Sequence, residues 1–179
     1  GDFKGIISKL DYLKNLGINA IWLNPHYDSP FMDGGYDVRD FFKCSSRFGT
    51  EEEFDLLVEQ CHQKNIHLIV DLVAGHTSEE NPMFIKSTSP KHNEFSDRFI
   101  WTKNPWDCPR EYKFINGRYN RFGAYMVNFF STQPALNYGF NKITADWQMS
   151  YKDSEPKKTQ EFLLSVMRFW LNRRVDGFR

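Results

Sequence analysis

The sequence predicts an α/β protein with parallel strands. The run from Ile66 to Val73 is apolar at nearly every position, which is typical of a strand buried on both faces of a parallel sheet. Helical periodicity alternates with such short apolar runs along most of the chain. An open doubly wound sheet and a barrel both fit this order. No Gly-x-Gly-x-x-Gly and no Gly-Lys-Ser/Thr loop follows a strand, and their absence favours the barrel.

Local signals predict the elements of the first half. Apolar residues at helical spacing between Ile6 and Leu16 indicate a helix that ends at Gly17. A strand is expected over 20–23, and a loop rich in turn formers over 26–49. Thr50 begins the next helix, because Glu53 three residues later completes a capping box. The apolar stripe of that helix is Phe54, Leu57, Val58 and Cys61.

The second half contains a long stretch without periodicity. Between residues 77 and 156 no convincing helix or doubly buried strand is recognisable, and a structureless loop of that length is improbable inside a compact domain. We therefore expect an inserted subdomain with short strands of its own. A helix follows over about 157–173, and a strand begins near Val175. The inward side chains of this helix are expected to be Phe162, Leu163, Val166, Met167 and Trp170.

Composition excludes some classes of function. Of the 179 residues, Lys and Arg together number 23 and so do Asp and Glu, which leaves no basic field for nucleic acid or an anionic membrane. No apolar segment approaches the ~20 residues of a membrane span. The three cysteines (Cys44, Cys61, Cys108) are scattered and odd in number, which favours free thiols. The 17% aromatic content is concentrated in loop-like sequence, where rings either stack on ligands or pack beneath the loop.

Polar residues follow the Ile66–Val73 run at the carboxyl end of the predicted strand, where ligands of such sheets bind. Asp71 and His76 lie there and form the first candidate site. From the local sequence alone, His76 is explained equally well as a loop histidine whose ring is hydrogen-bonded within the protein and binds no ligand. Tyr36 and Asp37 stand beside Gly34 and Gly35, so a plain turn explains them locally.

Six segments, in order and spanning nearly the whole chain, carry a resemblance. They are Asn19–Pro25, Gly35–Val38, Phe48–Thr50, Asp71–Val73 with His76–Ser78, Gln133–Asn137 and Asp176–Arg179. Their sequence and spacing resemble the α-amylase family of glycoside hydrolases, most closely its oligo-1,6-glucosidase and α-glucosidase branch. The resemblance implies a partial (β/α)8 TIM barrel, about strands two to four, with a small domain inserted after the third strand. Residues 1–76 and 157–179 would then belong to the barrel, and residues 77–156 to the insertion.

The resemblance also implies roles for individual residues. Tyr36 matches the aromatic residue that stacks on the sugar, and Asp37 the carboxylate that binds its non-reducing-end hydroxyl. His76 matches the histidine that hydrogen-bonds the same sugar. Arg179 matches the arginine two residues before the nucleophile, whose carboxylate it keeps ionised. Asp71 matches a structural acid beneath the site.

The catalytic acids themselves are expected outside the chain. By resemblance, the nucleophile of a retaining mechanism stands two positions after Arg179, and the general acid lies further on. No catalytic residue is therefore assigned here, and Gln133 is expected to be structural near the site. Gly75 replaces the usual asparagine, which makes calcium doubtful there, and no cofactor or metal is predicted. Ala135 replaces the acid common in this branch.

The expected function is that of a fragment of a retaining α-glycosidase acting on α-linked oligosaccharides, inactive by itself. Two alternatives stay open, a transglycosylase of the same family and a non-catalytic barrel partner protein. The expected partners are the oligosaccharide substrate and the rest of the barrel in the parent chain, with no nucleic acid and no membrane. The resemblance implies that the determinants of linkage specificity follow the nucleophile, and a signal peptide that decides the cellular compartment would precede Gly1.

Overall fold

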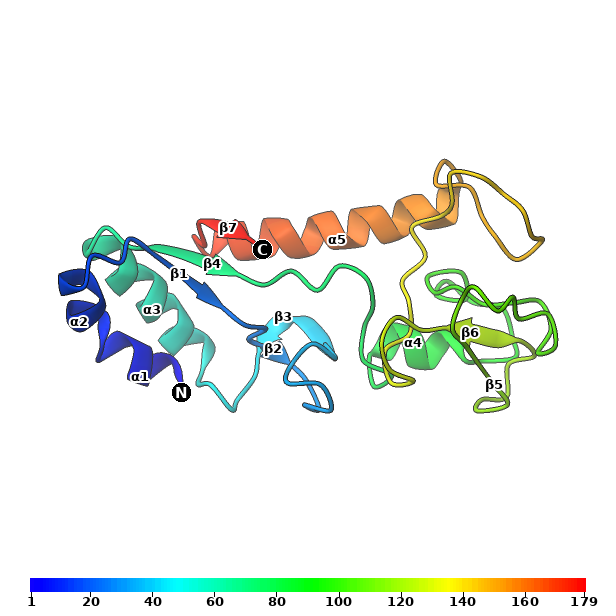
Figure 1. The fold of residues 1–179 in the computed structure, drawn as a ribbon, viewed down its shortest axis with the longest axis horizontal. Helices are drawn as coiled ribbons and strands as arrows, with labels where there is room; N and C mark the ends of the chain where they lie inside the picture. Colours follow the sequence, from blue (N-terminus) through cyan, green and yellow to red (C-terminus); the bar gives the residue numbers. More distant parts are fainter.

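The computed structural model describes residues 1–179 as an elongated molecule with two parts (Figure 1). One part holds a parallel sheet and the helices packed on it, and the other is built from the segment inserted between β4 and α5. The long helix α5 (Ser154–Asn172) runs from the inserted part back along the sheet. Both sequence ends of the chain lie in the part that contains the sheet (Figure 1).

Three parallel strands form the sheet, in the order β1 (Ala20–Leu23), β4 (His67–Val70) and β7 (Gly177–Phe178). Trp22 pairs with Ile69, and Ile69 pairs with Gly177. Parallel neighbours connected through helices are the building unit of a barrel wall or a doubly wound sheet. The predicted α/β class and the strand at 20–23 are confirmed.

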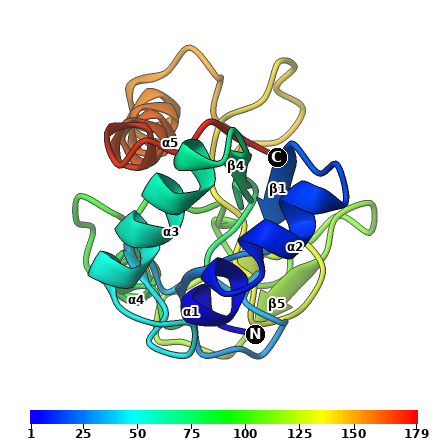
Figure 2. The ribbon, with the colours of Figure 1, turned by 90° about the vertical axis from the view of Figure 1, so that its left-hand side faces the viewer.

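Helices cover one face of this sheet (Figure 2). In α3 (Glu51–Gln63) the four predicted stripe residues are all buried, and Thr50 closes the predicted capping box with Glu53. Val166 and Trp170 of α5 are also fully buried, as predicted from its periodicity. The indole Nε1 of Trp170 donates to the carbonyl of Phe41 at 2.8 Å. The core therefore lies between the sheet and these helices.

The opposite face of the sheet is open, which corrects the prediction of a strand buried on both faces. Leu68 and Val70 are fully buried on the helix side, but Ile69 is only half-buried and its neighbour Trp22 is 47% exposed. The regular strand is also shorter than the apolar run that predicted it. The run has the composition of a strand covered on both faces, although residues 1–179 cover only one of them.

The predicted first helix is two short ones, α1 (Phe3–Ile7) and α2 (Leu10–Asn15). Lys9 between them has φ −110° and ψ 1°, outside the helical region. Gly17 has φ +89°, the left-handed conformation expected of a glycine after a helix end. The apolar spacing continues through the break, so the spacing alone predicts one helix.

The predicted loop at 26–49 contains a small antiparallel pair, β2 (Tyr27–Asp28) and β3 (Asp40–Cys44). Irregular pairing explains why the strands were missed. The register shifts between Tyr27 and Asp28, so period-two alternation never develops.

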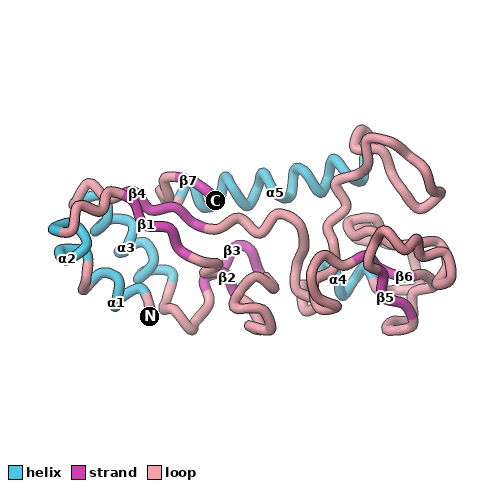
Figure 3. Tube along the Cα trace, in the orientation of Figure 1, coloured by secondary structure: helices cyan, strands magenta, loops and turns pink.

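The inserted segment contains the antiparallel strands β5 (Phe114–Asn116) and β6 (Ala124–Met126), in agreement with the prediction of short strands. Most of it is loop (Figure 3). The prediction that it has no helix is wrong, because α4 (Pro82–Ser87) lies within it. Asn81 caps that helix by accepting from the backbone N–H of Met83 at 2.9 Å. Asparagine followed by proline is a helix start signal, although α4 is too short for periodicity.

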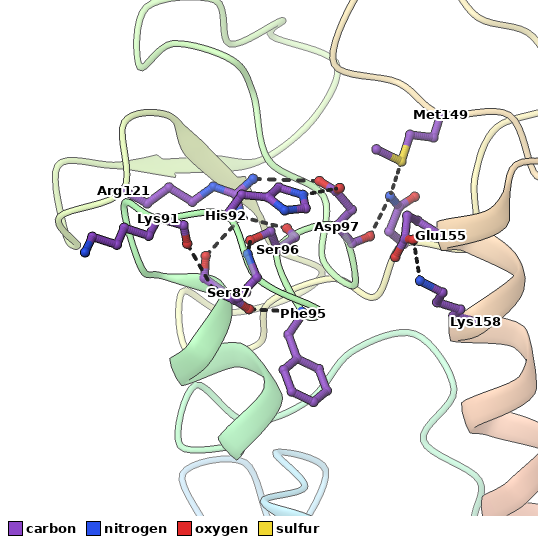
Figure 4. Close-up of polar contacts among 12 residues, drawn as sticks. Ser87, Lys91, His92, Phe95, Ser96, Asp97, Arg121, Met149, Glu155 and Lys158 are labelled. Atoms are coloured by element: carbon purple, nitrogen blue, oxygen red, sulfur yellow. Dashed lines mark hydrogen bonds and ion pairs between the residues drawn. The ribbon is translucent and has the colours of Figure 1, made fainter.

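Two features hold the inserted segment together. The first is a cluster of buried aromatic side chains, Phe84, Phe99, Trp101 and Tyr125. The second is Arg121, whose Nη1 donates to the carbonyls of Ser87 at 2.9 Å and Ser96 at 2.6 Å (Figure 4). Many loop rings therefore pack against each other, whereas Trp106, Phe122, Phe129 and Phe130 are exposed.

All three cysteines are free thiols, and Cys44 and Cys61 are buried in the main core. Burial raises the pKa of the Cys61 thiol to about 11. None of the helices combines the length and the hydropathy that a membrane-spanning helix requires.

Candidate functional site

The site is built where β4 and β7 end. Pairing continues beyond the regular strands, because Arg179 donates its backbone N–H to Val70 at 3.0 Å and accepts from Leu72 at 2.8 Å. This register places the Arg179 side chain beside that of Asp71. Asp71 lies two positions after Ile69, and Arg179 lies two positions after Gly177. Because side chains alternate along a strand and Ile69 pairs with both Trp22 and Gly177, Asp71 and Arg179 lie on the same open face of the sheet as Trp22.

Asp71 is the centre of the site. Its side chain is 3% exposed, and Oδ1 lies 3.3 Å from Nη1 of Arg179. Its other oxygen, Oδ2, accepts a hydrogen bond from the hydroxyl of Tyr36 at 2.8 Å. A buried carboxylate is tolerated only when it is paired and hydrogen-bonded, and both conditions are met here. The Tyr27 hydroxyl also donates to the Asp71 carbonyl at 2.5 Å, which anchors the backbone.

Tyr36 comes from the loop between β2 and β3. Burial, reinforced by the Asp71 carboxylate, raises the pKa of the Tyr36 phenol, so the hydroxyl stays protonated and donates. Gly35 before it has φ +103°, and a Cβ there would lie 2.9 Å from the carbonyl oxygen of Pro25. Only glycine fits this tight approach, which is how the loop delivers Tyr36 to Asp71.

Arg179 leaves most of its guanidinium free. Its side chain is 59% exposed, and its Cζ lies 4.3 Å from the centroid of the Trp22 ring. Stacking on an indole orients the guanidinium plane without using its hydrogen-bond donors. The arrangement holds a positive charge at the end of β7, with donors left for a further acceptor.

His76 links three parts of the chain. Its Nε2 lies 3.0 Å from the carbonyl oxygen of Tyr36, and its Nδ1 lies 3.1 Å from Nδ2 of Asn128 in the inserted segment. The residue is 4% exposed. Burial lowers the pKa of His76, which favours the neutral ring. Both ring nitrogens therefore have partners within the chain.

Asp37 is placed differently from its neighbour Tyr36. It is fully buried, and its carboxylate accepts from the hydroxyl of Ser29 at 2.9 Å and from the backbone N–H groups of Met32 at 2.9 Å and Asp33 at 3.1 Å. These bonds organise the loop that presents Tyr36. The Asp37 carboxylate makes no hydrogen bond or ion pair with Tyr36, Asp71, His76 or Arg179, although its charge acts on His76.

Gln133 connects the inserted segment to the same loop. It is fully buried, and its Nε2 donates to Oδ2 of Asp33 at 2.6 Å. Residues 75–79 pair with residues 132–136, as in the hydrogen bond from Leu136 N–H to the Gly75 carbonyl at 3.1 Å. This pairing carries Gln133 and Asn128 to the site.

The structure thus joins four of the six predicted residues, Tyr36, Asp71, His76 and Arg179, in one hydrogen-bonded network. Asp37 lies behind this network on the loop that carries Tyr36, and Gln133 contacts the same loop from the inserted segment. Asn128 and Trp22 were not predicted as site residues. Asn128 is a single polar residue between Val127 and Phe129, and Trp22 is one of four apolar residues of a strand, and neither pattern indicates a site.

No group of three or more His, Cys, Asp or Glu side chains is arranged to hold a metal ion. Gly75 offers no side-chain ligand. The space that a side chain would take is filled by the amide of Asn128, whose Nδ2 would lie 2.6 Å from an added Cβ.

Comparison with known proteins identifies the family. The family model described as alpha amylase, catalytic domain, matches residues 1–179. The oligo-1,6-glucosidase of Bacillus cereus is 39% identical over 186 residues, which cover 100% of this chain and 30% of that protein. The trehalose synthase/amylase TreS of Mycobacterium tuberculosis is 38% identical, with 100% and 28% covered. The chain therefore belongs to the α-amylase family.

Solved structures agree. The isomaltulose synthase of Klebsiella sp. LX3 has a TM-score of 0.85 and 37% identity, covering 100% of this chain and 31% of that one. The trehalose-6-phosphate hydrolase of Bacillus licheniformis has a TM-score of 0.83 and 32% identity, covering 100% and 31%. These are TIM-barrel enzymes of the family, and the mixed helices and strands of residues 1–179 are consistent with part of such a barrel. The chain spans about 30% of the length of the curated relatives it matches.

Proposed function

We propose that residues 1–179 form part of the catalytic barrel of a longer retaining α-glycosidase, and that Tyr36, His76 and Arg179 hold the glucosyl unit of an α-linked oligosaccharide. The observation that carries this proposal is the network centred on Asp71. It converges from the ends of two parallel strands, a loop and the inserted segment, as sites on barrels do. The family provides the reaction class, and the network provides the residues.

Each residue has a definite task in this proposal. Tyr36 offers an aromatic face to the sugar, held in place by its bond to Asp71. Arg179 supplies a fixed positive charge that keeps a nearby nucleophilic carboxylate ionised. A sugar hydroxyl that reaches His76 competes with the Tyr36 carbonyl for the single Nε2 hydrogen. Asp37, which we retain as a proposed sugar ligand, accepts three hydrogen bonds within the loop, and Oδ2, which accepts only one of them, has a lone pair left for a sugar hydroxyl.

Replacing His76 by alanine in the intact enzyme tests the proposal. We expect kcat/KM on an aryl α-glucoside to fall by a factor that corresponds to roughly 2–4 kcal/mol, because a positioned contact in a closed site is lost. His92→Ala is the matched control, since the His92 side chain is 77% exposed in the inserted segment. A loss of less than threefold for His76→Ala, with the protein folded, contradicts the assigned role.

A transglycosylase is the second candidate function, and the relatives give it specific support. A trehalose synthase/amylase and isomaltulose synthases are among the similar proteins, and one isomaltulose synthase mutant was solved with sucrose, its natural substrate. Hydrolysis and transfer share the same first step and differ only in the acceptor. Chromatography of the products from an unlabelled disaccharide separates them, because transfer yields a new disaccharide or a trisaccharide, whereas hydrolysis yields monosaccharides only.

A non-catalytic barrel protein is disfavoured by the same network. Such a protein has no need to keep a buried carboxylate with a tyrosine and an arginine directed at it, an arrangement whose desolvation is costly.

A further inference from the structure

The His76 ring has a determined pattern of hydrogens. The carbonyl of Tyr36 can only accept, so the Nε2 atom 3.0 Å away must carry the hydrogen. The group facing Nδ1 at 3.1 Å is the NH₂ of the Asn128 amide, which can only donate, so Nδ1 accepts and carries no hydrogen. Burial lowers the pKa of His76 and so favours the same neutral ring.

Asn128 is brought to this position by the inserted segment. It follows β6, and its backbone N–H donates to the Gln133 carbonyl at 3.2 Å. Residues 132–136, around Gln133, pair with residues 75–79 on either side of His76. The next residue, Phe129, sets its ring edge-on to His76 at 6.0 Å between centroids. The imidazole is thus held by three contacts from two distant parts of the chain.

Gly75 makes the Asn128 contact possible. A Cβ at position 75 would lie 2.6 Å from Nδ2 of Asn128, closer than non-bonded atoms approach. The backbone of Gly75 is not in the left-handed region, which contains seven other glycines of the chain. A glycine at position 75 is therefore explained by the space that the Asn128 amide occupies and not by the backbone conformation.

We propose that Asn128 is a positioning residue for His76, whose amide fixes the imidazole as a neutral, oriented Nε2–H donor, and that Gly75 is the opening that admits this amide. The inference extends the proposed function, because it assigns the sugar-facing histidine a partner in the inserted segment. It also gives that segment a task in the site beyond covering it.

The protonation pattern is tested directly in the intact enzyme. Ring ¹⁵N chemical shifts of histidine-labelled protein at neutral pH, assigned with His76→Gln, should show Nδ1 unprotonated and Nε2 protonated. In Asn128→Asp the facing carboxylate can only accept, so both ring nitrogens should become protonated. Asp33 and Asp37, the other carboxylates whose charge acts on the ring, are the same in both proteins. A protonated Nδ1 in the unmodified enzyme, or an unchanged ring in Asn128→Asp, overturns the proposal.

Kinetics test the pairing of positions 75 and 128. Gly75→Ala and Asn128→Leu should each lower kcat/KM by roughly tenfold, as loss of about one hydrogen bond implies. The double variant should lose no more than either single one, because both remove the same contact. Asn141→Leu, at an exposed asparagine of the inserted segment, is the matched control and should leave kcat/KM unchanged. Multiplying losses in the double variant, with melting temperatures unchanged, overturn the proposal.

The two readouts also separate this inference from the proposed function. If the ring shifts behave as expected but His76→Ala retains activity, the sugar-binding role fails while the positioning role stands. If His76→Ala is inactive but the ¹⁵N shifts of the His76 ring are the same in Asn128→Asp as in the unmodified enzyme, only the positioning role of Asn128 fails.

Discussion

Two buried titratable side chains, Asp71 and His26, differ in whether their polar atoms have hydrogen-bond partners. Asp71 is buried with Tyr36 and Arg179 directed at its two oxygens. His26 is also buried, at 1% exposure, but neither of its ring nitrogens has a partner. Its ring instead stacks on Phe54 at 4.8 Å with the planes 9° apart. Asp71 is thus a polar centre, whereas His26 behaves as an aromatic filler.

His26 should make stability depend on pH. Full burial, aided by the charge of Arg173, lowers its pKa to about 3. In the unfolded chain the pKa of His26 is about 6.5, so below that pH its imidazole binds a proton in the unfolded state but not in the folded state. Stability therefore decreases from pH 6.5 down to about 3, by roughly 1.4 kcal/mol per pH unit.

His26→Phe checks this dependence. The substitution keeps an aromatic ring in the stack and removes the titration, so the melting temperature of the variant should exceed that of the parent increasingly as pH falls from 7.5 to 4.5. At pH 7.5 the variant should already be at least as stable, since two unpartnered polar atoms are removed. A constant difference in melting temperature across this pH range contradicts the assignment.

Among the elements, α3 is the one that the sequence predicts best. Its start depends on contacts within four residues: the Thr50 hydroxyl accepts from Glu53 N–H at 3.3 Å, and Glu53 Oε2 accepts from Thr50 N–H at 3.2 Å. Its stripe also follows from local spacing alone. By contrast, β2 and β3 pair irregularly and α4 is six residues long, so neither produces a periodic signal. Predictability follows the length and regularity of the local pattern.

Thr50→Ala should destabilise the start of α3 by about 1 kcal/mol, because the cap hydrogen bond is lost and a helix N–H is left without a partner. Thr50→Ser keeps the hydroxyl and should stay close to the parent. Thermal melting of the intact enzyme and both variants measures the effect. Equal melting temperatures for alanine and serine would show that the capping box contributes nothing.

For the molecule as a whole, the open face and edges of the sheet decide behaviour. β1 and β7 are edge strands, and Trp22 and Ile69 lie on the face that no helix covers. Exposed edges and apolar faces promote association. These features agree with a piece of a barrel whose remaining strands complete the wall.

Residues 1–179 expressed alone are therefore expected to be aggregated or molten, and to lack glycosidase activity. Size-exclusion chromatography, calorimetry and hydrolysis of an aryl α-glucoside measure this, with the intact enzyme as control. A monomer with a cooperative melt contradicts the folding half of the prediction. Turnover above buffer that is unaffected by His76→Ala contradicts the activity half.

By itself the sequence determined the α/β class, the start and stripe of α3, the strand at 20–23 and the family to which six spaced segments point. These features depend on residue spacing, helix caps and motifs, which are set by residues close together in the sequence. Only the tertiary structure decided that β4 has an open face, that Asp71 is the centre of the network and that Asp37 faces the loop interior. It alone brought Asn128 to His76, 52 positions away, because such a contact depends on strand register and on the space left at Gly75.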